Sequence, residues 1–120
     1  MSHIVSIRTQ VKDPVAVQAA CRRLKLPVPQ QRTAQLYNSE ATGLVVELPD
    51  WKFPVVCDIT TGNLQYDNFN GHWGAESHLH RFLQSYAVEK ATIEARKQGH
   101  SVQEFALTDG SIRVQIAVAG

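Results

Sequence analysis

The segment 77–98 contains neither glycine nor proline, and Gly99 follows it directly. Glycine just past the last helical residue is typical of a helix end, so this segment predicts one long helix of about six turns. Its apolar side chains recur on one face, which has to be buried against another layer of the structure. They are Leu79, Phe82, Leu83, Tyr86 and Ile93. A chain of 120 residues has the usual length of one domain with one hydrophobic core, so we expect residues 1–120 to form a single domain.

The first half of the chain has the signals of one shorter helix and several strands. Asp13 and Pro14 supply an N-cap followed by proline at the first helical position, and apolar residues then recur at helical spacing up to Leu24. Residues 3–12 alternate between apolar and polar, which predicts a half-buried strand. Short β-prone runs separated by turn formers then predict an antiparallel meander. These runs are 33–37, 43–48, 53–59 and, less clearly, 63–67.

The last segment predicts a β-hairpin, because an Asp-Gly pair at 109–110 lies between two β-prone runs. A two-residue turn there places Leu107 opposite Ile112. It also makes Glu104 and Arg113 diagonal neighbours within side-chain reach. The whole order of elements favours an α+β two-layer sandwich, an antiparallel sheet with both helices on one face. We expect a ferredoxin-like arrangement with extra strands.

Composition limits the classes of function. The formal net charge of +1 gives no general electrostatic attraction to nucleic acid or to an anionic membrane. Long apolar runs and a leader-like N-terminus are absent from the sequence, so we expect a soluble, unprocessed, cytoplasmic protein. Cys21 and Cys57 stand apart from each other and from histidine clusters, and we expect both to be buried free thiols.

Three segments together resemble a known family: MSHIVSIRTQVKD at the start, YAVEKATIEARKQGH in the long helix and DGSIRVQI at the hairpin. The chain resembles the uncharacterised family called hypothetical chloroplast reading frame thirty-five, also domain of unknown function twelve fifty-seven, found in plastids, cyanobacteria and other bacteria. The resemblance runs nearly end to end and is weakest in the middle. That family has no established activity, so the resemblance implies no cofactor and no catalytic residue. In that family the gene often lies near a gene for an AAA-type ATPase. The resemblance therefore implies an AAA-type ATPase as a protein partner.

Three histidines lie at the start of the long helix and raise the question of a metal site. His78 and His80 are two residues apart, which places them about 200° apart on a helix, so they cannot bind the same metal ion. Ser77 is the expected N-cap, because its hydroxyl can accept a free backbone N–H. We interpret His72 as a surface histidine and Trp73 as a plug that packs its loop onto the core.

Lys90 lies in the apolar stripe of the long helix, where a leucine would be expected. One interpretation is structural: the aliphatic stem packs while the ammonium reaches solvent or Glu94, one turn along. The other is functional: Lys90 serves as a cation for an anionic ligand or partner, together with Arg113. Replacing Lys90 by methionine separates the two.

Three functions remain open on the sequence alone. We favour a non-enzymatic interaction or adaptor protein that acts through protein partners, with no cofactor and no metal. The alternatives are a nucleic-acid-binding module on the polar sheet face, using Arg8, Lys12 and Arg113, and a small enzyme with a site near the loop from Asp67 to His80. No residue is indicated as catalytic, and the candidate partner-binding residues are Lys90, Arg113, His72 and Trp73.

Overall fold

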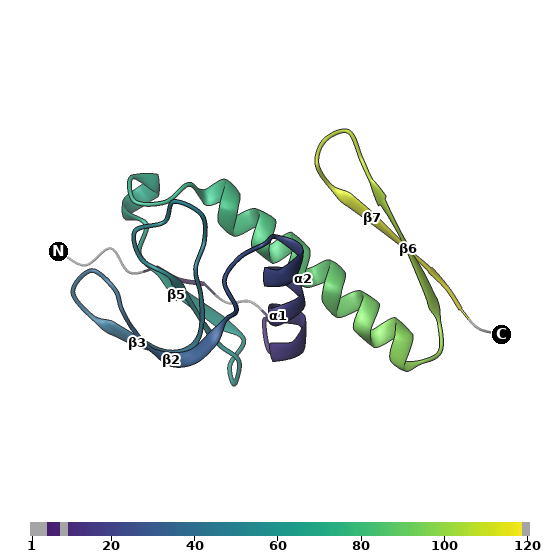
Figure 1. Cartoon of the computed structure of the whole chain (residues 1–120), viewed down its shortest axis with the longest axis horizontal. Helices are drawn as coiled ribbons and strands as arrows, with labels where there is room; N and C mark the ends of the chain where they lie inside the picture. Colours follow the sequence, from purple (N-terminus) through teal and green to yellow (C-terminus); the bar gives the residue numbers. More distant parts are fainter. Residues whose placement is uncertain (1–4, 8–9, 119–120) are drawn as a thin grey trace.

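The computed structural model describes residues 5–7 and 10–118 of the chain. These residues form a five-stranded antiparallel sheet, a separate two-stranded sheet and two α-helices (Figure 1). The predicted α+β class with an antiparallel sheet is therefore confirmed. The elements are β1 (Val5–Ile7), α1 (Pro14–Arg23), β2 (Gln30–Gln35), β3 (Glu40–Val46), β4 (Val55–Asp58), β5 (Asn63–Tyr66), the 3-10 turn η1 (Phe69–Gly71), α2 (Glu76–Lys97), β6 (Ser101–Ala106) and β7 (Ile112–Ala117).

The larger sheet has the strand order β1-β5-β4-β3-β2. Strands β2 to β5 form the predicted meander, although β2 begins three residues before the predicted run and ends at Gln35. Strand β1 pairs antiparallel with β5 and forms one edge of the larger sheet, while β2 forms the other edge. Strands β6 and β7 pair with each other and are not part of the larger sheet.

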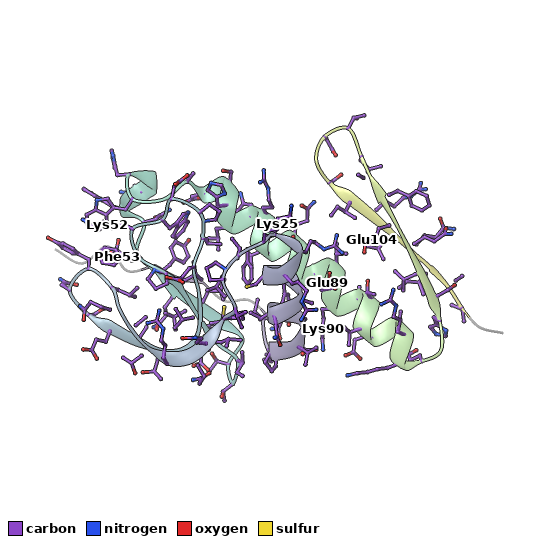
Figure 2. All side chains as sticks on the ribbon, in the orientation of Figure 1. Lys25, Lys52, Phe53, Glu89, Lys90 and Glu104 are labelled. Atoms are coloured by element: carbon purple, nitrogen blue, oxygen red, sulfur yellow. The ribbon has the colours of Figure 1, made fainter. Side chains whose placement is uncertain are left out.

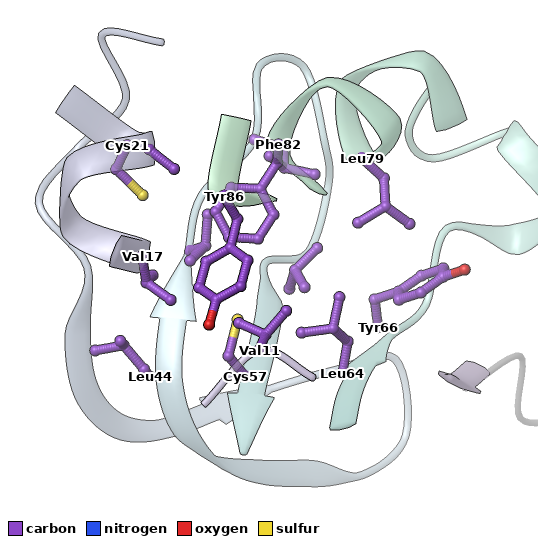
Figure 3. Packing of buried hydrophobic residues seen from close by; sticks show 14 of the residues in the cluster. Val11, Val17, Cys21, Leu44, Cys57, Leu64, Tyr66, Leu79, Phe82 and Tyr86 are labelled. Carbon is purple, nitrogen blue, oxygen red and sulfur yellow. The ribbon is translucent and has the colours of Figure 1, made fainter. Parts of the chain in front are cut away.

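Both helices bury their apolar faces against one face of the larger sheet (Figure 3). From the predicted stripe of α2, Leu79, Phe82 and Tyr86 are buried in this core, while Leu83 and Ile93 pack at its border. Burial of a side chain such as Phe82 contributes about 1.5–3 kcal/mol to folding. The residues contributed by α1 are Ala16, Val17, Ala20 and Cys21, and those contributed by the sheet are Leu44, Val46, Val55, Cys57, Leu64 and Tyr66.

The two cysteines are free and buried in this core, as predicted. Burial raises the pKa of the Cys21 thiol to about 11. Burial, with a smaller effect of Cys21, raises the pKa of the Cys57 thiol to about 12. Because only the thiolate is a good nucleophile, both side chains act as small apolar residues.

Helix α1 begins as predicted. The Asp13 carboxylate accepts hydrogen bonds from the backbone N–H groups of Val15, at 2.9 Å, and Ala16, at 3.3 Å, and Pro14 is the first helical residue. Its C-terminal end turns through Lys25, which has a left-handed φ of 59°. The Leu26 N–H then donates to the Cys21 carbonyl at 2.8 Å, which completes a Schellman motif around a residue other than glycine.

Helix α2 ends as predicted but begins earlier. Gly99 has a φ of 80°, and the His100 N–H donates to the Ala95 carbonyl at 3.0 Å, which makes a Schellman motif. At the other end the N-cap is Ala75, so the predicted capping role of Ser77 is wrong and Ser77 lies inside the first turn. The Ala75 carbonyl is fixed by Trp51, whose indole N–H donates to it at 3.0 Å. This contact comes from a residue distant in sequence and positions the N-cap residue, which makes no side-chain hydrogen bond to the helix.

The β6–β7 hairpin has a different register from the predicted one. Its loop has three residues, 108–110, and Gly110 occupies the last position with a φ of 87°. The Leu107 N–H donates to the Ser111 carbonyl at 2.9 Å, and the Gly110 N–H donates to the Leu107 carbonyl at 3.1 Å. This is the pattern of a turn followed by a glycine bulge, which shifts the pairing by one residue. Phe105 therefore lies opposite Arg113, and the expected diagonal contact of Glu104 with Arg113 is wrong.

The hairpin lies along the C-terminal half of α2, beyond the end of the larger sheet, and gives the molecule an elongated shape of 55 × 32 × 23 Å (Figure 1). The partly buried side chains of its two strands, Val102, Ile112 and Val114, share the face that packs on α2. Among the residues that the structure describes, neither helix is long and apolar enough to cross a membrane.

Candidate protein-interaction site

An ion-pair cluster joins the hairpin to both helices. The Arg23 guanidinium donates two hydrogen bonds of 2.8 Å to the two oxygens of Glu104 on β6, and one of 3.0 Å to Glu89 on α2. Figure 2 labels these two glutamates. The bond from Arg23 holds the pKa of the Glu104 carboxyl below its ordinary value, against the opposing effect of burial. The same bonds raise the pKa of Arg23. This geometry is the bidentate pairing that arginine makes with carboxylates, and it fixes the hairpin against α1.

The hairpin and the residues next to it carry more than half of the large apolar side chains that the described residues expose. Of the seven large apolar side chains that the described residues expose, four belong to the hairpin and the residues next to it. They are Phe105, Leu107, Ile116 and Val118, with exposed fractions of 36%, 45%, 43% and 72%. Single exposed apolar residues are ordinary, but a group of them on one small element is typical of an interaction surface.

The hairpin face that points away from α2 carries an aromatic ring and a cation together. The Arg113 guanidinium lies 4.5 Å from the centre of the Phe105 ring, in a cation–π contact. The two residues are directly opposite each other in the register, so the contact is fixed by the hairpin itself. We call Phe105, Leu107 and Arg113 the hairpin surface.

Trp73 is the centre of an aromatic cluster at the loops near the start of α2. Its ring lies 5.1 Å from that of Tyr37, 5.6 Å from that of Phe53 and 4.8 Å from that of Phe69. The Lys52 ammonium lies 4.6 Å from the Trp73 ring centre, and the Lys52 N–H donates to the Trp73 carbonyl at 2.8 Å. These contacts confirm that Trp73 packs its loop onto the body of the protein.

His72 and Asp67 make separate contacts, and the Asp67 carboxylate is not hydrogen-bonded to the His72 ring. His72 is exposed and its ring lies 5.0 Å from that of Phe69. Asp67 is fully buried; one carboxylate oxygen accepts a bond of 3.2 Å from the Phe69 N–H, and the other has no hydrogen-bond partner. The backbone between them is left-handed at Phe69, with φ 47°, and at Asn70, with φ 52°. The buried carboxylate thus belongs to the turn, and neither of its oxygens is bonded to His72.

The remaining two histidines of the loop and helix point in different directions, as predicted. His80 is exposed and its ring lies 3.9 Å from the Glu76 carboxylate. His78 is partly buried and borders a cavity of about 40 Å³ beside Leu24 and Leu48. The described part of the chain holds no group of three side chains that could bind a metal ion.

Lys90 is bound by two carboxylates. Its ammonium donates to Glu94 at 2.9 Å, which confirms the predicted contact one turn along, and to Asp13 at 3.1 Å. Bonds from Glu94 and Asp13 raise the pKa of Lys90 to about 12. Burial alone would raise the pKa of Asp13, but its bonds from Lys90 and from the amides of Ala16 and Val15 outweigh that effect and lower it. Lys90 therefore links α2 to the N-cap of α1.

The structure does not bring Lys90 and Arg113 together. Lys90 reaches toward α1, whereas Arg113 lies on the hairpin face away from α2. Arg113 is also on a different sheet from β1, so the expectation of one polar sheet face that includes Arg113 is wrong. Arg8 lies outside the described residues, and the backbone N–H of Lys12 donates to the Tyr86 hydroxyl at 3.1 Å.

Arg113 was predicted as a partner contact, but the other residues of the hairpin surface were not. Phe105 and Leu107 are not among the candidate residues predicted from the sequence, because the predicted single antiparallel sheet includes no separate hairpin. Arg23 was missed as well, because its two carboxylate partners lie 66 and 81 residues away.

Comparison with known proteins finds no relative of this chain. No family model matches it, and neither the curated proteins nor the solved structures give a match.

Proposed function

We propose that this protein is a non-enzymatic interaction or adaptor protein that binds a protein partner through the hairpin surface. The observation that carries the proposal is the hairpin itself: it lies outside the main sheet and exposes Phe105 and Leu107 beside Arg113. Aromatic residues and arginine are enriched at the energetic centres of protein interfaces, because both give large contact area and directed bonds. A hairpin fixed by the Arg23 ion pairs presents them with little loss of conformational entropy on binding.

Several finer expectations belong to the same proposal. Membership of the uncharacterised plastid and bacterial family, the cytoplasmic location and the likeness to a ferredoxin-like fold stay predictions. The AAA-type ATPase is the partner implied by that resemblance. The roles of Lys90, His72 and Trp73 as partner contacts are secondary predictions, since the charge of Lys90 is already paired and Trp73 packs within its own loop cluster.

Affinity capture from a lysate of the native organism tests the proposal, with the wild type and two matched variants as baits. Phe105→Ser removes the exposed ring from the hairpin, and Val28→Ser removes an apolar side chain that is 69% exposed elsewhere. We expect the wild type and Val28→Ser to retain one protein in a stoichiometric amount and Phe105→Ser to lose it. If no bait retains a stoichiometric protein, or if all three retain it equally, the proposal is wrong.

A further inference from the structure

The register of the hairpin shows which backbone groups of β7 are unpaired. Leu107 and Ser111 form a hydrogen-bonded pair, and such pairs alternate along an antiparallel ladder, so residues 111, 113, 115 and 117 point their amides toward β6. The N–H and C=O groups of Ile112, Val114 and Ile116 therefore point to the other edge of β7. An edge of this kind is a template for pairing with another strand.

This edge lacks the features that keep other edges from pairing. Strand β7 and Val118 after it contain no proline, no acidic residue and a single charge, that of Arg113. By contrast, β2, an edge of the larger sheet, is nearly all polar and follows two prolines. Strand β6 carries Glu104 on its own edge, already held by Arg23. Among these three strands, β7 is therefore the one suited to pairing.

We propose that β7 pairs antiparallel with β7 of a second copy of this chain, around a two-fold axis at Gln115. In this register Val114 lies opposite Ile116 of the second copy, and Ile112 lies opposite its Val118. Each apolar side chain then meets another, which buries the exposed Ile116 and Val118. The two Arg113 side chains lie four residues apart along the ladder, so like charges do not oppose each other. The strand is thus complementary to itself, and the result is a four-stranded sheet.

Two cysteine substitutions test the register, and they match in chemistry and exposure. Gln115 and Gln103 lie opposite each other in the hairpin, both exposed. In the proposed dimer the two Gln115 residues face each other in a non-hydrogen-bonded pair about 4.5 Å apart, within disulfide range. The two Gln103 residues are separated by three strand spacings, about 14 Å, which is too far. The native cysteines are buried and should not react.

Under mild oxidation we expect Gln115→Cys to become mostly disulfide-linked dimer and Gln103→Cys to remain monomeric on a non-reducing gel. Equal cross-linking of both variants, or none of either, overturns the proposal. Sedimentation of the unmodified proteins provides the second readout. Ile116→Pro removes the edge N–H together with the side chain and should sediment as a folded monomer, whereas the control Ile116→Ala, which keeps that N–H, should still associate, though more weakly than the wild type. This test reports self-association and does not depend on whether the hairpin surface binds another protein.

Discussion

The bidentate bond between Arg23 and Glu104 should stabilise the folded state by about 1 kcal/mol, and a double-mutant cycle can measure this coupling energy. Exposed ion pairs contribute about 0.2–1 kcal/mol. Both bonds here are 2.8 Å, and the side chains are 29% and 33% exposed, so water screens the pair only in part. We therefore expect a coupling near the upper end of that range. The single bond from Arg23 to Glu89, at 3.0 Å, should give about half as much.

The cycle compares the wild type, Arg23→Met, Glu104→Gln and the double variant by urea unfolding at pH 7. Methionine keeps an aliphatic stem of similar length, so the comparison isolates the charge and its hydrogen bonds. The corresponding cycle with Glu89→Gln is the matched control. A coupling below about 0.3 kcal/mol for Arg23 with Glu104, or one no larger than that with Glu89, would refute the view that this bond fixes the hairpin.

The same coupling should depend on pH with a definite sign. The folded pKa of Glu104 lies below its ordinary value of 4.5, so the bond stabilises the folded state fully above that value. The contribution should be lost as the pH falls from 4.5 through the folded pKa, because the carboxyl then takes up a proton in both states. Glu104→Gln should show no such loss from this position. A coupling that is unchanged at pH 3 would contradict the assignment.

Three further variants test other parts of the structure. Lys25→Gly should raise the free energy of unfolding by about 0.5–1 kcal/mol, because the left-handed φ of 59° suits glycine; a lower urea midpoint would contradict the motif. Gly74→Ala should cost about 1–3 kcal/mol and quench or shift the tryptophan fluorescence, because the new Cβ would lie 2.4 Å from the Trp51 ring; unchanged stability and fluorescence would show that the contact is not there. Lys90→Met should leave stability at pH 7 nearly unchanged but move the pKa of Asp13 up toward 3.8, measured by NMR titration; a loss of partner binding without these effects would favour a direct role for Lys90.

The elements that could be predicted from the sequence are those fixed by local contacts. The Asp13 cap, the Gly99 helix end and the apolar stripe of α2 depend on residues within a few positions of one another, so their spacing is enough. The Lys90 contact with Glu94 is local in the same way.

The features that could not be predicted depend on distant partners or on one extra residue. The N-cap at Ala75 is fixed by Trp51, and Lys90 binds Asp13, 77 residues away. The observed hairpin register differs from the predicted one because Gly110 occupies the third loop position rather than the second. A shift of one residue changes every facing pair. The separation of β6 and β7 from the main sheet follows from the length of α2, which carries the chain past the sheet before the hairpin begins.

The most direct test of the proposed function is site-specific photocrosslinking in living cells of the native organism. A benzophenone side chain replaces Phe105 in one strain and Val28 in another, both exposed positions. The hairpin surface predicts one dominant cross-linked protein for position 105 that is absent for position 28. If position 105 gives no adduct, or if both positions give the same adducts, the hairpin is not the partner-binding surface.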